Sequence, residues 1–183
     1  SDNAVKWFEA RGISQRTLIK MKISEGPEWM PQTSKTENTI QFNYFINNEL
    51  INIKYRDGRK NFKLVKGAEK VFYNLDSTVG HDYVVIVEGE MDALSFVDAK
   101  IDSVVSVPNG ATLNRLNLDY LDSCIEYFDD KSKIIIAVDS DEAGQNLQQE
   151  LIRRFGAEVC YTISFGEHKD ANEFLLQHGS SML

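Results

Sequence analysis

The sequence predicts an α/β fold: a mostly parallel, doubly covered four-stranded sheet, preceded by a small α+β subdomain. Four short runs rich in Val and Ile lack polar alternation, which is typical of strands buried on both faces; they lie at 83–87, 104–107, 133–138 and 159–163. Helical patterns fit between and after them, at about 91–99, 117–128, 142–155 and 171–178. Because strands that alternate with helices form parallel sheets, we expect an α/β domain in residues 81–183 and a separate subdomain in residues 1–80.

The first residues of the chain predict a short pair of helices. Residues 4–20 are helical in pattern, but Gly12 can end one helix and Ser14 can cap the next. The stretches 25–27 and 30–34 contain Gly, Pro and Ser, and we expect them to be loops.

A hairpin region follows. Apolar residues alternate from Ile40 to Ile46, as in a half-buried strand. Asn47–Asn48 then predicts a tight turn into a second strand at 50–55, and Asp57–Gly58 predicts another hairpin after it.

Composition restricts the class of protein. With 183 residues, 42% of them hydrophobic, the chain can bury a core. It has no apolar run near the roughly 20 residues of a membrane span and no basic-then-apolar leader, so we expect no membrane association and a cytoplasmic location. Two isolated cysteines and three histidines without ligand spacing predict no zinc in this chain.

The net charge of −8 is unevenly distributed. Residues 1–80 contain 13 Lys and Arg against 9 Asp and Glu, whereas residues 81–183 contain 7 against 19. The segment 54–70 holds seven basic residues, opposed only by Asp57 and Glu69. This local basic patch favours a nucleic-acid partner, and a solvated face is the alternative explanation of such a run.

Carboxylates follow two of the predicted strands. Glu88 ends the first run, and Asp139 and Asp141 follow the third. Ligands of α/β sheets bind outside the carboxyl ends of the strands, so these side chains can converge. Converging oxygen ligands suit Mg²⁺ or Mn²⁺, whose usual work is on phosphate esters.

A structural explanation of the same residues stays open. Asp141 begins a helix and Asp92 nearly does, so both could simply be N-caps, each stabilising its helix by about 1 kcal/mol. The further carboxylate Asp170, at a matching strand end, favours convergence over capping alone.

Four motifs in the second part resemble the Toprim domain, which DNA primases share with type IA and II topoisomerases and certain nucleases. They are Glu88-Gly89 with Asp92, the loop Val107–Thr112, the run Asp139–Gly144, and the run Lys169–Glu173. Bacterial primases commonly have an aspartate where this chain has Asn172. The Asp-Ala-Asn-Glu form is similar to that of phage-type and mitochondrial primase-helicases.

The first part also resembles primases. Trp7–Ser14 is similar to the opening of the primase polymerase core. Tyr55–Phe62, with Phe72–Asn74 after it, resembles the basic hairpin region that contacts template and nucleotides. The resemblance therefore covers nearly the whole chain.

The resemblance implies an activity and a set of site residues. The chain is expected to be the catalytic core of a DNA primase of DNA replication, a nucleotidyltransferase that makes RNA primers from ribonucleoside triphosphates on single-stranded DNA. Glu88, Asp139 and Asp141 are the expected catalytic residues and, with Asp92 and Asp170, the expected Mg²⁺ or Mn²⁺ ligands. The residues expected to bind nucleotide or nucleic acid are Lys54, Arg56, Lys60, Lys63, Asn109, Gly110 and Lys169.

Two other functions stay open. The sequence shows neither a cysteine quartet nor a Gly-x-x-x-x-Gly-Lys loop. Either the chain is a segment of a longer protein, with a helicase domain or partner expected outside it, or it is a relative that has lost those functions. A Toprim nuclease would use the same carboxylates to hydrolyse DNA. A non-catalytic DNA-binding module would use the basic patch and ignore the carboxylates.

Overall fold

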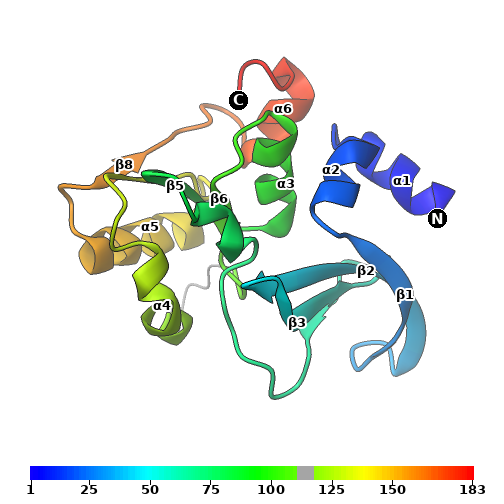
Figure 1. Ribbon diagram of the computed structural model, residues 1–183. Helices are drawn as coiled ribbons and strands as arrows, with labels where there is room; N and C mark the ends of the chain where they lie inside the picture. Colours follow the sequence, from blue (N-terminus) through cyan, green and yellow to red (C-terminus); the bar gives the residue numbers. More distant parts are fainter. Residues whose placement is uncertain (111–117) are drawn as a thin grey trace.

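The computed structural model describes residues 1–110 and 118–183 and contains two four-stranded sheets (Figure 1). The antiparallel sheet has the order β1-β2-β3-β4, with β1 Ser24–Met30, β2 Lys35–Ile46, β3 Glu49–Arg56 and β4 Phe62–Leu64. The parallel sheet has the order β6-β5-β7-β8, with β5 Tyr83–Val87, β6 Val104–Ser106, β7 Lys133–Ile136 and β8 Cys160–Thr162. The predicted fold class is confirmed: a parallel sheet follows a smaller α+β region.

The predicted helix pair at the N-terminus is present as α1 (Asp2–Glu9) and α2 (Gln15–Lys20). Gly12 turns the chain between them with a φ of +75°, a conformation that glycine adopts without steric cost. Ser14 caps α2, since its side chain accepts a hydrogen bond from the Thr17 backbone N–H. The Asp98 carboxylate fixes this cap to helix α3 (Glu90–Asp98) by accepting hydrogen bonds from the Ser14 N–H, the Ser14 hydroxyl and the Thr17 hydroxyl at 2.9, 2.5 and 2.6 Å.

Replacing Asp98 by alanine is expected to lower the free energy of unfolding by about 2 kcal/mol at neutral pH, because three donors lose a charged acceptor. Burial alone would raise the pKa of Asp98, but the hydrogen bonds from Ser14 and Thr17 outweigh it and lower that pKa below its ordinary 3.8. The contribution of Asp98 is therefore present above pH 3.8 and is lost as the pH falls through the lowered pKa. Urea denaturation of both proteins across this range measures the effect.

Asp102 provides the control for this experiment. It is half exposed and has one ion pair, with Lys20 Nζ at 2.6 Å. The Asp102→Ala variant should therefore stay within about 0.5 kcal/mol of the unchanged protein. Equal losses in the two variants would contradict the assigned role of Asp98.

The antiparallel sheet confirms both predicted hairpins and corrects one prediction. Asn47 and Asn48 join β2 to β3 with φ values of +51° and +62°, as a tight hairpin turn requires. Asp57 shapes the next hairpin by accepting hydrogen bonds from the N–H groups of Arg59 and Asn61. The loop expected at 25–27 was wrong: these residues belong to strand β1, and Pro27 fits there because β1 is an edge strand.

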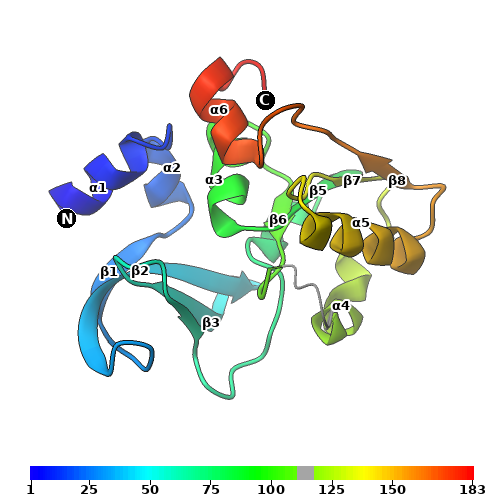
Figure 2. The ribbon, with the colours of Figure 1, turned by 180° about the vertical axis from the view of Figure 1, so that it is seen from behind.

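The parallel sheet and its helices agree with the sequence to within a few residues. Four buried apolar residues in a row, Val84–Val87, form most of β5, which pairs with β6 on one side and β7 on the other. Helix α3 packs on β6 and on α6, near the N-terminal helices, whereas α4 and α5 lie farther from those helices (Figures 1 and 2). The remaining helices are α4 Asp119–Cys124, α5 Glu142–Phe155 and α6 Ala171–His178, with short 3-10 turns at Leu75–Thr78 (η1) and Ile125–Tyr127 (η2).

One hydrophobic core includes residues from both sheets and from the N-terminal helices. Phe8, Phe42 and Ile86 are all nearly inaccessible and belong to the same buried cluster. The segment after β4 also joins the parts, because Tyr73 pairs with Ser106 at the edge of β6. The division of the chain at residues 80 and 81 stays a prediction.

Candidate active site

Carboxylates from several elements gather at the carboxyl ends of the parallel strands. Glu88 directly follows β5, and Asp139 lies three residues after β7. Asp92 lies in the first turn of α3, and Asp170 precedes α6. The charges of Glu88, Asp139 and Asp170 all act on Asp92. The structure thus brings together these four of the five carboxylates that the sequence singled out.

Asp92 is the most buried member of this cluster, with 7% of its surface exposed. Burial raises its pKa well above the ordinary range, and the charges of Asp170, Asp139 and Glu88 raise it further. The Asn172 backbone N–H opposes this effect by donating a hydrogen bond to Asp92 Oδ1 at 3.1 Å. A cation beside Asp92 would relieve the repulsion.

Lys169 supplies positive charge to the outer part of the cluster. Its Nζ lies 3.1 Å from Asp139 Oδ2 and 3.7 Å from Asp141 Oδ2. Burial raises the pKa of Asp139, and Lys169 partly offsets that effect, whereas the hydrogen bond and charge of Asp139 raise the pKa of Lys169. The Lys169 side chain is 53% exposed, so it can turn away when another cation or a phosphate arrives.

Two of the carboxylates also cap helices. Asp141 Oδ1 accepts a hydrogen bond from the Gly144 N–H at 3.0 Å, and Asp170 Oδ1 accepts one from the Glu173 N–H at 2.8 Å. Asp92 is not the N-cap of its own helix, which is Gly89, but it accepts the N–H of Asn172 in the first turn of α6. Capping therefore accounts for part of Asp141 and Asp170, and the bond to α6 for one oxygen of Asp92. One oxygen of each capping carboxylate stays outside these bonds.

Glycines let the backbone approach the carboxylates. A Cβ at Gly144 would lie 2.1 Å from the Asp139 carbonyl oxygen, so no side chain fits there. Gly110, with a φ of +64°, faces Glu88 from the loop after β6, and a Cβ there would lie 3.8 Å from Glu88 Oε1. Asn109 lies in the same loop, and the last residues of the predicted motif, Ala111 and Thr112, fall outside the described residues.

Basic and aromatic side chains line a pocket of about 350 Å³ together with the carboxylates. The Arg11 guanidinium lies 3.8 Å from the centre of the Trp7 ring, and that of Arg56 lies 4.6 Å from the same ring. Burial lowers the pKa of both arginines. The residues that line this pocket are Trp7, Arg11, Phe42, Arg56, Lys60, Phe62, Gly89, Glu90, Met91, Asp92, Asp139, Lys169, Asp170 and Asn172.

The site combines predicted and unpredicted residues. Arg56, Lys60 and Lys169 were expected at a binding site, and they line the pocket. Arg11 was not singled out, although it stands in the primase-like segment Trp7–Ser14, which was the available signal. Trp7 belongs to the same segment.

Two predicted basic residues are engaged elsewhere in the structure. Lys54 Nζ lies 2.8 Å from Glu90 Oε1, and both side chains are nearly buried. Lys63 Nζ lies 2.5 Å from Glu28 Oε1 and donates to the Trp29 carbonyl. Their role in nucleic-acid binding stays a prediction.

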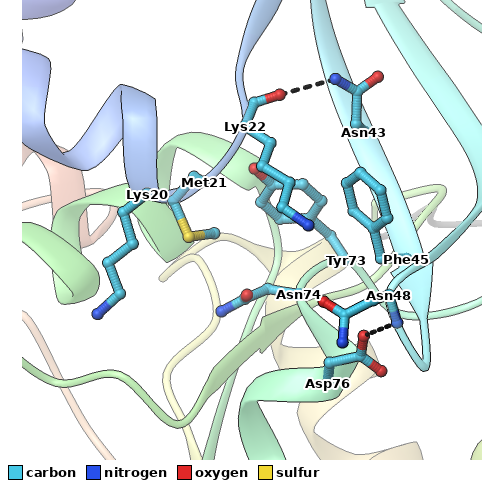
Figure 3. A pocket seen from close by; sticks show the side chains of 9 residues that line it. All are labelled: Lys20, Met21, Lys22, Asn43, Phe45, Asn48, Tyr73, Asn74 and Asp76. Carbon is cyan, nitrogen blue, oxygen red and sulfur yellow. Dashed lines mark hydrogen bonds between the residues drawn. The ribbon is translucent and has the colours of Figure 1, made fainter.

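A second hollow lies between the end of α2, strand β2 and the turn η1 (Figure 3). Its polar groups mostly serve the fold: the Asn43 side chain donates to the Lys22 carbonyl, and the Asn48 N–H donates to Asp76. Lys22 Nζ lies 4.2 Å above the Phe45 ring. Asp76 is the single carboxylate in its lining, so this hollow lacks the ligand set of the first pocket.

The donor set of the carboxylate cluster fits a hard divalent cation. Carboxylate oxygens are the ligands that Mg²⁺ and Mn²⁺ prefer, and the raised pKa values of Asp92 and Asp139 reflect buried, crowded negative charge. In the described part of the chain, no three Asp, Glu, His or Cys side chains are positioned to hold an ion together. Lys169 lies beside Asp139 and Asp141, so the binding of an ion there requires side chains to move.

Comparison with known families identifies the second part of the chain. Residues 85–175 match the model of the Toprim-like family. These residues form a Toprim domain. All the carboxylates of the cluster lie within it, whereas Arg11 and Arg56 reach the Toprim domain from the preceding region.

Two relatives with known names align with the whole length of the chain. It is 34% identical to the "Primase homolog protein" of Arabidopsis thaliana over all of its own length and 57% of the relative's. It is 33% identical to the "Twinkle homolog protein, chloroplastic/mitochondrial" of the same plant, again over all of its own length but 27% of the relative's. The chain thus spans between about a quarter and just over half of these two relatives.

The primase fragment of the bacteriophage T7 primase-helicase is a similar solved structure. It shares 26% identity and a TM-score of 0.77 with this chain, covering 93% of this chain and 68% of the fragment. The chain therefore resembles the primase part of phage-type primase-helicases. No helix among the described residues is long and apolar enough to span a membrane. The cytoplasmic location stays a prediction, and the name of one relative refers to chloroplasts and mitochondria.

Proposed function

We propose that this chain is the catalytic core of a DNA primase, which joins ribonucleoside triphosphates into short RNA primers on single-stranded DNA. The observation that carries the proposal is the pocket that Asp92, Asp139 and Asp170 line together with Arg11 and Arg56. The carboxylates suit a divalent cation, and the guanidinium groups suit phosphates. The primase names of the relatives favour primer synthesis among the reactions that such a pocket supports.

The chain's own residues have distinct tasks in this reaction. Asp139 and Asp141 hold Mg²⁺ or Mn²⁺, with Asp92 and Asp170 as further ligands. Such an ion, when bound, supplies positive charge that offsets the charge of the reacting phosphates. Glu88, at the end of the central strand, is a further ligand or takes the proton of the attacking 3′-hydroxyl.

The basic residues bind and orient the phosphates. Arg11 and Arg56 are held in place by the Trp7 ring, so they lose little freedom when a phosphate binds. Lys60 and Lys169 are more exposed and suit the template or the triphosphate tail. Gly110 lies beside Glu88, and Asn109 and Gly110 contact the nucleotide.

The partners of this proposed core are single-stranded DNA, ribonucleoside triphosphates and a helicase domain outside this segment. A helicase partner is supported by the name of the T7 relative, a primase-helicase protein. Binding to DNA should weaken as salt rises, because lysine and arginine contacts to phosphates release counterions.

The direct test incubates the chain with single-stranded DNA, labelled ribonucleotides and Mn²⁺, and resolves products and template on one denaturing gel. New short labelled oligomers are the expected result. A shortened template would favour the nuclease. A third outcome is an intact template and no product, with a variant that lacks the carboxylates binding the template as tightly as the unchanged chain does. That outcome would favour a non-catalytic DNA-binding module.

A further inference from the structure

Asn172 joins three separate parts of the molecule at the edge of the pocket. Its side-chain amide donates one hydrogen bond to the Arg11 carbonyl and another to Ser95 Oγ, each at 2.9 Å. Its backbone N–H donates to Asp92 Oδ1. One residue of α6 is thus bonded to the turn after α1 and to two residues of α3.

These contacts require an amide at position 172. The Arg11 carbonyl only accepts hydrogen bonds, and the hydroxyl proton of the buried Ser95 is already donated to the Met91 carbonyl at 2.9 Å. A carboxylate at 172 would offer no donor to either partner. It would also add another negative charge beside the crowded Asp92.

The turn that carries Arg11 also packs directly on α6. A Cβ at Gly12 would lie 3.2 Å from the Leu175 side chain, one turn after Asn172. The Arg11 backbone is therefore fixed by α6, and its guanidinium is fixed by Trp7, including a hydrogen bond to the Trp7 carbonyl at 2.9 Å.

We propose that Asn172 is a positioning residue that holds Arg11 in the pocket that the carboxylates also line, and is not itself a metal ligand. The effect of Asn172 on catalysis rests on the proposed function, because that function assigns phosphate binding to Arg11. The position of Arg11 itself can be measured without any activity.

The first test reads the position of Arg11 from Trp7. The Trp29→Phe change leaves Trp7 as the single tryptophan, and its fluorescence quenching by acrylamide is compared in Asn172→Ala, Asn172→Asp and Gln177→Ala variants. Gln177 lies exposed on the same helix and is the matched control. We expect Arg11→Ala and both Asn172 variants to increase the quenching, and Gln177→Ala to leave it unchanged. Unchanged quenching in folded Asn172 variants overturns the proposal.

The second test is a double-mutant cycle with Arg11→Ala, which removes the guanidinium but keeps the carbonyl that Asn172 binds. Each single change should raise the KM for ribonucleotides roughly tenfold, the usual effect of losing one good hydrogen bond. The KM of the double variant should be no higher than that of Arg11→Ala alone. The decreases in melting temperature of the two single variants should add. If the increases in KM of the two single variants multiply in the double variant, Asn172 acts independently of Arg11 and the proposal is overturned. A chain that makes no primers at all would count against the proposed function, and the Trp7 quenching would then decide the role of Asn172.

Discussion

The Asp139→Asn variant is expected to lose at least about 100-fold in primer synthesis, the usual loss when one group that stabilises transition-state charge is removed. Asparagine has the shape of aspartate but lacks the negative charge that a divalent ion requires. The change also removes the charge that holds Lys169 at 3.1 Å. Gel assays of primer synthesis and titration of Mn²⁺ binding measure the two effects.

The fold should survive this change. Burial raises the pKa of Asp139, which means that its charged form is disfavoured in the folded protein, so a neutral asparagine should not lower the melting temperature. Asp129→Asn is the matched control, because it makes the same change on an exposed residue of the loop before β7. Normal Mn²⁺ affinity in Asp139→Asn would refute the metal site.

The Glu90→Ala variant is expected to lose about 3–5 kcal/mol of unfolding free energy, the usual effect of removing one partner of a buried ion pair. Glu90 is 4% exposed, and its Oε1 accepts hydrogen bonds from Lys54 Nζ at 2.8 Å and from the Tyr44 hydroxyl at 2.5 Å. Burial and the Glu90 charge raise the pKa of Tyr44 well above its ordinary value, so this hydroxyl stays protonated and donates. Because Glu90 belongs to α3 and its partners to β2 and β3, the change also loosens the antiparallel sheet from the helix that carries Asp92.

Two further variants separate the buried charge from other effects. Glu49→Ala removes an exposed glutamate at the start of β3 and should stay within about 0.5 kcal/mol of the unchanged protein. Adding Lys54→Met to Glu90→Ala should restore part of the stability, because no charge is then buried without a partner. Chemical denaturation checks all three proteins. If Glu90→Ala proves as stable as Glu49→Ala, the ion pair contributes nothing measurable.

Local sequence patterns were sufficient to predict the strands and the clustered carboxylates of the Toprim domain. Uninterrupted apolar runs mark strands covered on both faces, and the carboxyl ends of parallel strands share one edge, so Glu88 and Asp139 were predictable neighbours. The pattern failed at β1, where Gly26 and Pro27 suggested a loop. An edge strand tolerates both residues because part of its backbone needs no partner.

The sequence alone determined the fold class, the hairpins and the residues of the carboxylate cluster, because each depends on local periodicity or on a motif in one segment. Only the tertiary structure decided which cations face that cluster. Lys54 is paired with Glu90, 36 residues away, and Asn172 binds the carbonyl of Arg11 across 161 residues. Such contacts depend on how helices and sheets pack against one another. No local pattern distinguishes a lysine or arginine that is neutralised in the interior from one that faces the pocket.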